Sequence, residues 1–279
     1  MECKLNNITI HYQTFGEGKP ILILHGAPLD HRALLGCMEP IFKNRTDWRR
    51  IYPDLPGMGR TKRGNWIISA DQMLEVVLEF IDRIIPGQNF TLVGHSYAGY
   101  LARGIIYHRR QAVDGLFLLV PWIKYDWEDR NTPEKVTLVE DQTLLAQLDP
   151  NEREGFAFGA VVQNQKNWER FCSEWLPGIQ AHDPQFFDQL IEHSPFSFEV
   201  DALSEPFVKP TLILMGKQDH VAGYRNQWDI LENYSRATFV VLDRAGHRLQ
   251  IEQEALFNAL VDEWLDRVEE CMVNDPGVG

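Results

Sequence analysis

The chain has 279 residues, 44% of them hydrophobic, and a formal net charge of −13. This length fits one large α/β domain with an insertion, or two modest domains, and it is enough to bury a substantial core. The negative charge argues against nucleic acid and anionic membrane surfaces as partners, because both are bound through a basic face.

The sequence predicts a cytoplasmic protein with reduced thiols. No stretch approaches the roughly 18 consecutive apolar residues of a membrane span, and the first residues lack the apolar core of a signal peptide. The four cysteines are scattered and form no Cys-x-x-Cys pair: Cys3, Cys37, Cys172 and Cys271. Metal-binding and redox roles are therefore not expected for them.

Short apolar segments typical of strands alternate with helical patterns through the first half of the chain. Residues 3–14 predict an antiparallel hairpin before a turn at 16–18. Further strands are expected at 20–24, 50–53, 90–93 and 113–120, with helices at 31–42, after Ser69 and at 101–107. Ser69 with Gln72 three residues later indicates a capping box for its helix.

The composition changes between residues 122 and 200, which is the clearest internal boundary. This segment holds 15 acidic and 6 basic residues and 12 of the 31 aromatic residues. A capping residue precedes proline at three places, which predicts three helix starts: Thr132-Pro133, Asp149-Pro150 and Asp183-Pro184. We therefore divide the chain into 1–121, 122–200 and 201–279, with a helical insertion in the middle.

The α/β pattern resumes after the insertion, with strands at 211–215 and 238–242, a helix near 225–234 and a closing amphipathic helix from Gln253. The alternation predicts a mostly parallel, doubly wound sheet, in which active residues gather at the carboxyl ends of the strands. Polar residues do follow the predicted strands: His25, Asp54, Ser96, Asp219 and His247.

Ser96 falls on a tight turn between a predicted strand and a predicted helix. Small residues at Gly94, Ala98 and Gly99 allow the helix to fold back onto the strand. Such a turn exposes the hydroxyl and directs backbone N–H groups toward whatever it attacks. Alone this is a weak motif, because many such turns carry a serine without function.

A serine nucleophile needs a base, and the base needs a partner that fixes its tautomer. Asp219 and His247 suit these roles because both lie in loops after strands. Singly, each would more often be a loop residue with a local hydrogen bond. Asp243 is the reserve acid, although it lies only four positions before His247. His95, beside the serine, is predicted to be structural.

The chain closely resembles the α/β-hydrolase superfamily, whose triad follows the order Ser, Asp, His. The resemblance covers nearly the whole length and rests on five segments: His25-Gly26-Ala27-Pro28, Asp54-Leu55-Pro56-Gly57-Met58-Gly59, Gly94-His95-Ser96-Tyr97-Ala98-Gly99, Gly216-Lys217-Gln218-Asp219, and Gly246-His247 with Glu252. It implies an eight-stranded sheet and a helical cap, which matches residues 122–200.

The resemblance also implies the roles of individual residues. Ser96 would be the nucleophile, His247 the base and Asp219 the acid that orients it. The backbone N–H groups of Ala27 and Tyr97 would hold the oxyanion.

One position departs from the family pattern, because Ala98 stands where a second glycine is usual. We expect this methyl group to adjust the packing only. Serine at 96, where relatives that dehalogenate or open epoxides have aspartate, favours acyl transfer to water. His25, Trp122 and Tyr125 are the pocket candidates, since they follow strands at the active end of the sheet.

Other residues of the insertion are interpreted as structural. Trp168, Phe171 and Trp175 recur at helical spacing, which favours a face that docks the insertion on the sheet. His182 and His193 lack His-x-x-x-His spacing, so no metal site is expected.

The sequence therefore predicts a serine hydrolase that cleaves a small carboxylic ester or related acyl compound through an acyl-enzyme, without cofactor or metal. The alternative is an aminopeptidase of the proline-iminopeptidase type, in which carboxylates of the insertion would hold a free α-amino group. A third hypothesis is a ligand-binding protein that keeps the fold without catalysis. Substrate identity and oligomeric state do not follow from the sequence.

Overall fold

The computed structural model describes residues 1–191 and 194–274, and eight strands in these residues form one sheet in the order β1-β2-β4-β3-β5-β6-β9-β10. The strands are β1 (Glu2–Lys4), β2 (Thr9–Phe15), β3 (Lys19–Leu24), β4 (Trp48–Pro53), β5 (Phe90–His95), β6 (Val113–Leu119), β9 (Thr211–Gly216) and β10 (Ala237–Leu242). β2 pairs antiparallel with β1 and β4, and every pair from β4 to β10 is parallel. The predicted hairpin and mostly parallel sheet are confirmed.

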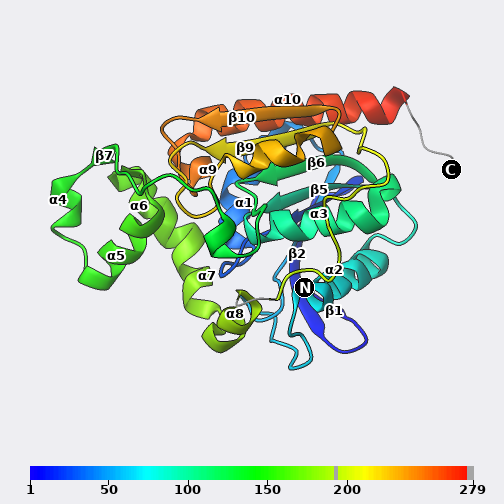
Figure 1. Cartoon of the computed structure of the whole chain (residues 1–279), viewed down its shortest axis with the longest axis horizontal. Helices are drawn as coiled ribbons and strands as arrows, with labels where there is room; N and C mark the ends of the chain where they lie inside the picture. The colour runs from blue at the N-terminus through cyan, green and yellow to red at the C-terminus, as the bar shows by residue number, and fades with distance from the viewer. Residues whose placement is uncertain (192–193, 275–279) are drawn as a thin grey trace.

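Helices cover both faces of the sheet (Figure 1). α1 (Arg32–Met38) and α10 (Glu254–Asn274) pack on one face, and α2 (Ala70–Ile84) and α3 (Tyr97–Arg109) on the other. β5 and β9 are buried at every residue, as expected of strands enclosed between two helical layers. None of the described helices is long and apolar enough to cross a membrane.

Residues 122–200, called the insertion below, lie between β6 and β9, and their helices gather at one end of the sheet in Figure 1. They contain α4 (Gln142–Leu145), α5 (Pro150–Gly159), α6 (Gln165–Arg170), a π-helix (Phe171–Trp175), α7 (Leu176–Ala181), α8 (Pro184–Ile191) and the short strands β7 (Val139–Glu140) and β8 (Val162–Gln163). Two predicted helix starts are confirmed, because Asp149 caps α5 and Asp183 accepts a hydrogen bond from the Phe186 N–H.

The third predicted helix start, at Thr132-Pro133, is wrong. Residues 131–138 adopt no helix and run toward β7, and the N–H groups of Leu138 and Val139 donate to the Val161 carbonyl. Pairing with a distant segment thus overrides the local capping signal. The capping box at Ser69 also differs, since the Ser69 hydroxyl donates to the Gln72 side chain and accepts no backbone N–H group of the helix.

Several short helical turns complete the chain. The helix predicted at 31–42 ends at Met38 and is followed by a 3₁₀ turn, and the helix predicted near 225–234 is a 3₁₀ helix. The remaining short elements are the 3₁₀ turns Ile41–Asn44, Arg110–Ala112, Trp127–Asp129 and Asn226–Asn233, and the helix α9 (Leu249–Glu252).

Candidate active site

Ser96 occupies a strained turn between β5 and α3. Its φ of 54° and ψ of −118° are rare for a residue with a side chain, and such strain persists only where the surroundings enforce it. A Cβ on Gly94 would lie 2.5 Å from the Ala98 carbonyl oxygen, and one on Gly99 would lie 2.6 Å from the Pro121 Cβ. Both glycines are therefore required by close packing, whereas the Ala98 methyl group is accommodated in the core.

The structure brings Ser96, His247 and Asp219 together in one hydrogen-bonded chain. The Nε2 atom of His247 lies 2.8 Å from the Ser96 Oγ, and its Nδ1 atom lies 2.9 Å from an Asp219 carboxylate oxygen. Asp219 is completely buried and His247 is 7% exposed. A carboxylate at Nδ1 holds the proton there and leaves Nε2 free to accept the serine proton.

The Asp219 carboxylate is fixed by its own loop after β9. One oxygen accepts the N–H groups of Val221 and Ala222, and the other faces His247. Asp243, the reserve acid, lies elsewhere: its side chain is exposed and is held by Gln218. Asp219 is therefore the acid that meets the imidazole.

Two backbone N–H groups beside the serine have no acceptor among the described residues. One belongs to Ala27, after β3, and the other to Tyr97, the first residue of α3. The Ala27 loop runs directly past the serine, since a Cβ on Gly26 would lie 2.8 Å from the Ser96 Cβ. Both groups are thus free to donate to a developing oxyanion.

His95 and His25 support the loops around the serine. The Nδ1 atom of His95 accepts the Gly26 N–H at 3.2 Å, which agrees with its predicted structural role. His25 was predicted to line the pocket, but it does not: its Nδ1 lies 2.8 Å from the Gly26 carbonyl oxygen, and its Nε2 accepts the Leu55 N–H. Both ring nitrogens of His25 therefore serve to join two backbone segments.

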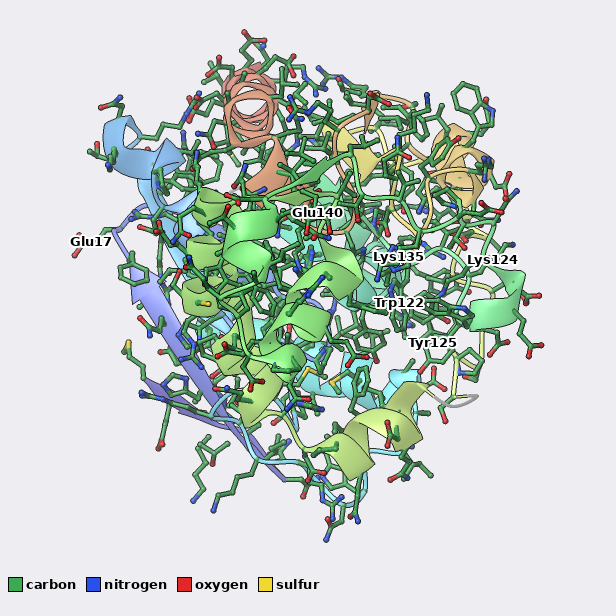
Figure 2. The ribbon with its side chains drawn as sticks, turned by 90° about the vertical axis from the view of Figure 1, so that its left-hand side faces the viewer. Glu17, Trp122, Lys124, Tyr125, Lys135 and Glu140 are labelled. Carbon is green, nitrogen blue, oxygen red and sulfur yellow. The ribbon has the colours of Figure 1, made fainter. Side chains whose placement is uncertain are left out.

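A cavity of about 480 Å³ opens onto Ser96 and His247 between the sheet and the insertion. Trp122 and Tyr125, both predicted for the pocket, line it, and Figure 2, viewed from the insertion side, shows them close together. The other aromatic residues of its wall are Trp127, Phe158, Trp175 and Phe187. Such a wall suits an apolar group of the substrate.

Most of the lining residues were not predicted from the sequence, among them Trp175, Arg130 and Arg248. Trp175 was expected to dock the insertion, and it does pack with Leu29, Ala33 and Ile251 outside the insertion. It also lines the cavity, where its ring lies 6.3 Å from that of His247. Phe171 belongs to the same cluster and Trp168 packs against it, which confirms the predicted docking face. Arg130 and Arg248 also line the cavity. The only sequence signal for Arg248 is its place directly after His247.

One cluster of potential metal ligands occurs in the described part of the chain: His11, His31 and Asp54. Both histidines direct Nδ1 at the Asp54 carboxylate, at 3.0 and 2.7 Å, and backbone N–H groups of His31 and Arg60 donate to it as well. These hydrogen bonds occupy the acceptor positions of the Asp54 carboxylate and fix the loop after β4. In the insertion, His182 Nδ1 contacts the Ile179 carbonyl, and His193 lies outside the described residues.

The geometry agrees with comparisons to known proteins. A solved structure of an alpha/beta superfamily hydrolase from Oenococcus oeni PSU-1 is 32% identical, with a TM-score of 0.87 over 96% of this chain and 99% of that chain. The AB hydrolase superfamily protein YisY of Bacillus subtilis (strain 168) is 23% identical, covering 92% of this chain and 96% of its own length.

A further relative is the pimeloyl-[acyl-carrier protein] methyl ester esterase of Legionella pneumophila (strain Paris), 20% identical over 92% of this chain and 100% of its own length. The family model described as "Alpha/beta hydrolase family" matches residues 21–260. The chain belongs to the alpha/beta hydrolase family.

Proposed function

We propose that this hydrolase is a serine esterase that cleaves a small carboxylic ester or related acyl compound through an acyl-enzyme, beneath the insertion acting as a cap. The observation that carries the proposal is the continuous chain from Ser96 Oγ through His247 to Asp219 at 2.8 and 2.9 Å. Esterase relatives and esterase structures of the same fold support it.

In the first half of the proposed reaction, His247 Nε2 takes the Ser96 proton as Oγ attacks the ester carbonyl carbon. The N–H groups of Ala27 and Tyr97 donate to the oxyanion that forms. His247 then gives its proton to the leaving alcohol, the C–O bond breaks, and the acyl group stays on Ser96.

In the second half, a water molecule loses its proton to His247 and attacks the acyl carbon. The tetrahedral intermediate collapses, the proton returns to Ser96, and the carboxylic acid leaves. The Asp219 carboxylate stabilises the imidazolium in both halves. No step uses a cofactor or a metal.

The aminopeptidase alternative has less support from the cavity. A free α-amino group needs a carboxylate partner, and none of the cavity-lining residues in the described chain is Asp or Glu. Two of them are arginines, which would repel an ammonium group. The acidic residues of the insertion therefore supply no amine site at this cavity.

The proposal is tested with a fluorophosphonate reagent and p-nitrophenyl esters of graded acyl length. We expect labelling of the wild type at Ser96 and turnover that falls on the order of 10⁶-fold in Ser96→Ala, as for other serine nucleophiles. Ser173→Ala, which changes an exposed serine of the insertion, should behave like the wild type. Full turnover by Ser96→Ala, or no labelling at any pH, would contradict the mechanism.

A further inference from the structure

Two arginine side chains line the apolar cavity beside Ser96. Arg248 is 3% exposed and Arg130 is 9% exposed, so both guanidinium groups are largely removed from water. A buried charge is costly unless an opposite charge or a full set of hydrogen bonds compensates it. Whether the protein itself compensates these two charges therefore determines whether the cavity has room for a negatively charged ligand group.

Arg248 is bonded only to neutral groups. Its Nη1 and Nη2 atoms donate to the carbonyl oxygens of Phe156 and Gly155 in α5, at 2.7 and 2.9 Å. Its Nε–H has no acceptor among the described residues. A Cβ on Gly159 would lie 3.3 Å from that Nε, so the edge of the guanidinium faces a position where the cavity wall has no side chain.

Arg130 is likewise bonded only to carbonyl groups. It donates to the carbonyl oxygens of Lys124, Val221 and Tyr125 at 3.1, 3.2 and 2.7 Å. Its guanidinium also lies 3.8 Å from the centroid of the Trp122 ring. These contacts are favourable, but they bring no negative charge.

The nearest acidic groups are engaged with other partners. Glu252 acts on Arg248 at longer range, yet its carboxylate accepts the N–H groups of Val161, Val162 and Gly246. Asp219 and Asp126 act on Arg130 in the same way at longer range, and Asp219 is occupied by His247 and its own loop. Within the described chain, neither arginine has a carboxylate within 4.0 Å.

Burial lowers the pKa of both guanidinium groups to about 10, and the distant carboxylates offset this only in part. Both therefore remain charged at neutral pH. Two N–H donors of Arg248, on Nη1 and Nη2, bind carbonyl oxygens near the carboxyl end of α5 and so cap that helix. These bonds leave its Nε and the net positive charge of the cavity without a counterpart.

We propose that the cavity accepts an acyl substrate with an apolar body and a carboxylate, whose charge is balanced by Arg248 and Arg130. The inference rests on the proposed esterase function and names its substrate class. The aromatic wall contacts the apolar body, and the carboxylate supplies the negative charge that the protein lacks at this place.

Two esters of equal length test the proposal: mono-p-nitrophenyl adipate, which carries a carboxylate, and p-nitrophenyl hexanoate, which ends in a methyl group. We expect kcat/KM of the wild type to be at least about tenfold higher for the adipate ester, the effect of one charge-assisted hydrogen bond. In Arg248→Met and Arg130→Met this ratio should fall toward one. Arg109→Met, which removes an exposed arginine paired with Asp82, should keep the wild-type ratio.

Gly159→Ala covers the case in which an arginine variant fails to fold. It keeps both arginines and their carbonyl partners, and it places a methyl group beside the Arg248 Nε. We expect KM for the adipate ester to rise more than KM for the hexanoate ester. Equal changes for the two esters would contradict a role of that edge in binding the carboxylate.

A binding measurement separates this inference from the esterase proposal. In Ser96→Ala, monomethyl adipate should quench the fluorescence of cavity tryptophans at lower concentration than methyl hexanoate. If the fluorophosphonate labels Ser96 and both p-nitrophenyl esters are cleaved equally well, the carboxylate inference is overturned and the esterase proposal stands. If neither ester is cleaved and nothing is labelled, the esterase proposal fails, and the fluorescence titration alone decides for or against the carboxylate.

Discussion

The two walls of the cavity are built in different ways. On the sheet side, Ser96 and His247 follow β5 and β10, and backbone constraints hold them: a strained φ at the serine and glycines that allow no side chain. On the insertion side, short helices and a π-helix present Trp175 and other aromatic groups, and arginine contacts to carbonyl oxygens join them to the catalytic loops. This difference agrees with our proposal that the sheet side carries out the reaction and the insertion selects the substrate.

After the loss expected in Ser96→Ala, the next largest effect is also on the sheet side and compares two acids near the same loops. We expect Asp219→Asn to lower kcat on the order of 10⁴-fold, because an amide no longer holds the His247 tautomer. Asp243→Asn should leave kcat unchanged, since Asp243 is exposed and contacts Gln218. Steady-state hydrolysis of a p-nitrophenyl ester checks both variants. Equal losses would show that Asp219 has no special role.

A pair of glycine substitutions compares how well the two walls tolerate an added methyl group. Gly99→Ala places a methyl group 2.6 Å from the Pro121 Cβ, and we expect overpacking to lower the free energy of unfolding by about 1–3 kcal/mol. Gly155→Ala lies within α5, where the nearest atom would be 3.9 Å away, and alanine should stabilise that helix by about 0.5–1 kcal/mol. Urea unfolding monitored by circular dichroism measures both. A destabilised Gly155→Ala would mean that the insertion is packed as tightly as the turn.

The smallest expected effect concerns pH and the histidine behind the serine. Burial holds the pKa of His95 well below its ordinary value of 6.5, so the native state keeps this ring neutral. The unfolded state binds a proton below pH 6.5, and the free energy of unfolding should therefore fall with decreasing pH by up to about 1.4 kcal/mol per pH unit for this residue.

Urea titrations at pH 7.0, 6.0 and 5.0 give that slope. His95→Gln keeps an acceptor for the Gly26 N–H and should give a shallower pH dependence than the wild type. His108→Gln, on the exposed side of α3, should not change the slope. His25 is also buried with a lowered pKa, so part of the slope should persist in His95→Gln. An unchanged slope in His95→Gln would contradict a neutral buried ring.

The residues after the strands could be predicted because local sequence and a general property of parallel sheets act together. Continuous apolar runs mark strands enclosed on both faces, and the carboxyl ends of parallel strands meet at one edge. His247 is 151 residues from Ser96 and 28 residues from Asp219 in the sequence, yet this rule places all three at the same edge. The reaction and the hydrogen-bond donors beside it follow from that placement as proposals.

The residues that the sequence did not reveal depend on contacts with distant segments. Thr132-Pro133 has a helix-start pattern, but its chain continues toward a strand pairing with residues 161–163. His25 follows a strand like Ser96, yet its ring is occupied by two backbone groups. Neither outcome is encoded in the neighbouring residues.

By itself the sequence determined the alternation of strands and helices behind the mostly parallel sheet, because hydrophobic periodicity is a local property of the chain. Its resemblance to α/β hydrolases singled out Ser96, Asp219 and His247, which converge at the sheet edge. Only the tertiary structure decided that Trp175, Arg130 and Arg248 line one cavity with Ser96. Their side chains come from segments with no shared periodicity, and the partners of the two arginines are backbone carbonyl groups, which every residue carries and no sequence pattern marks.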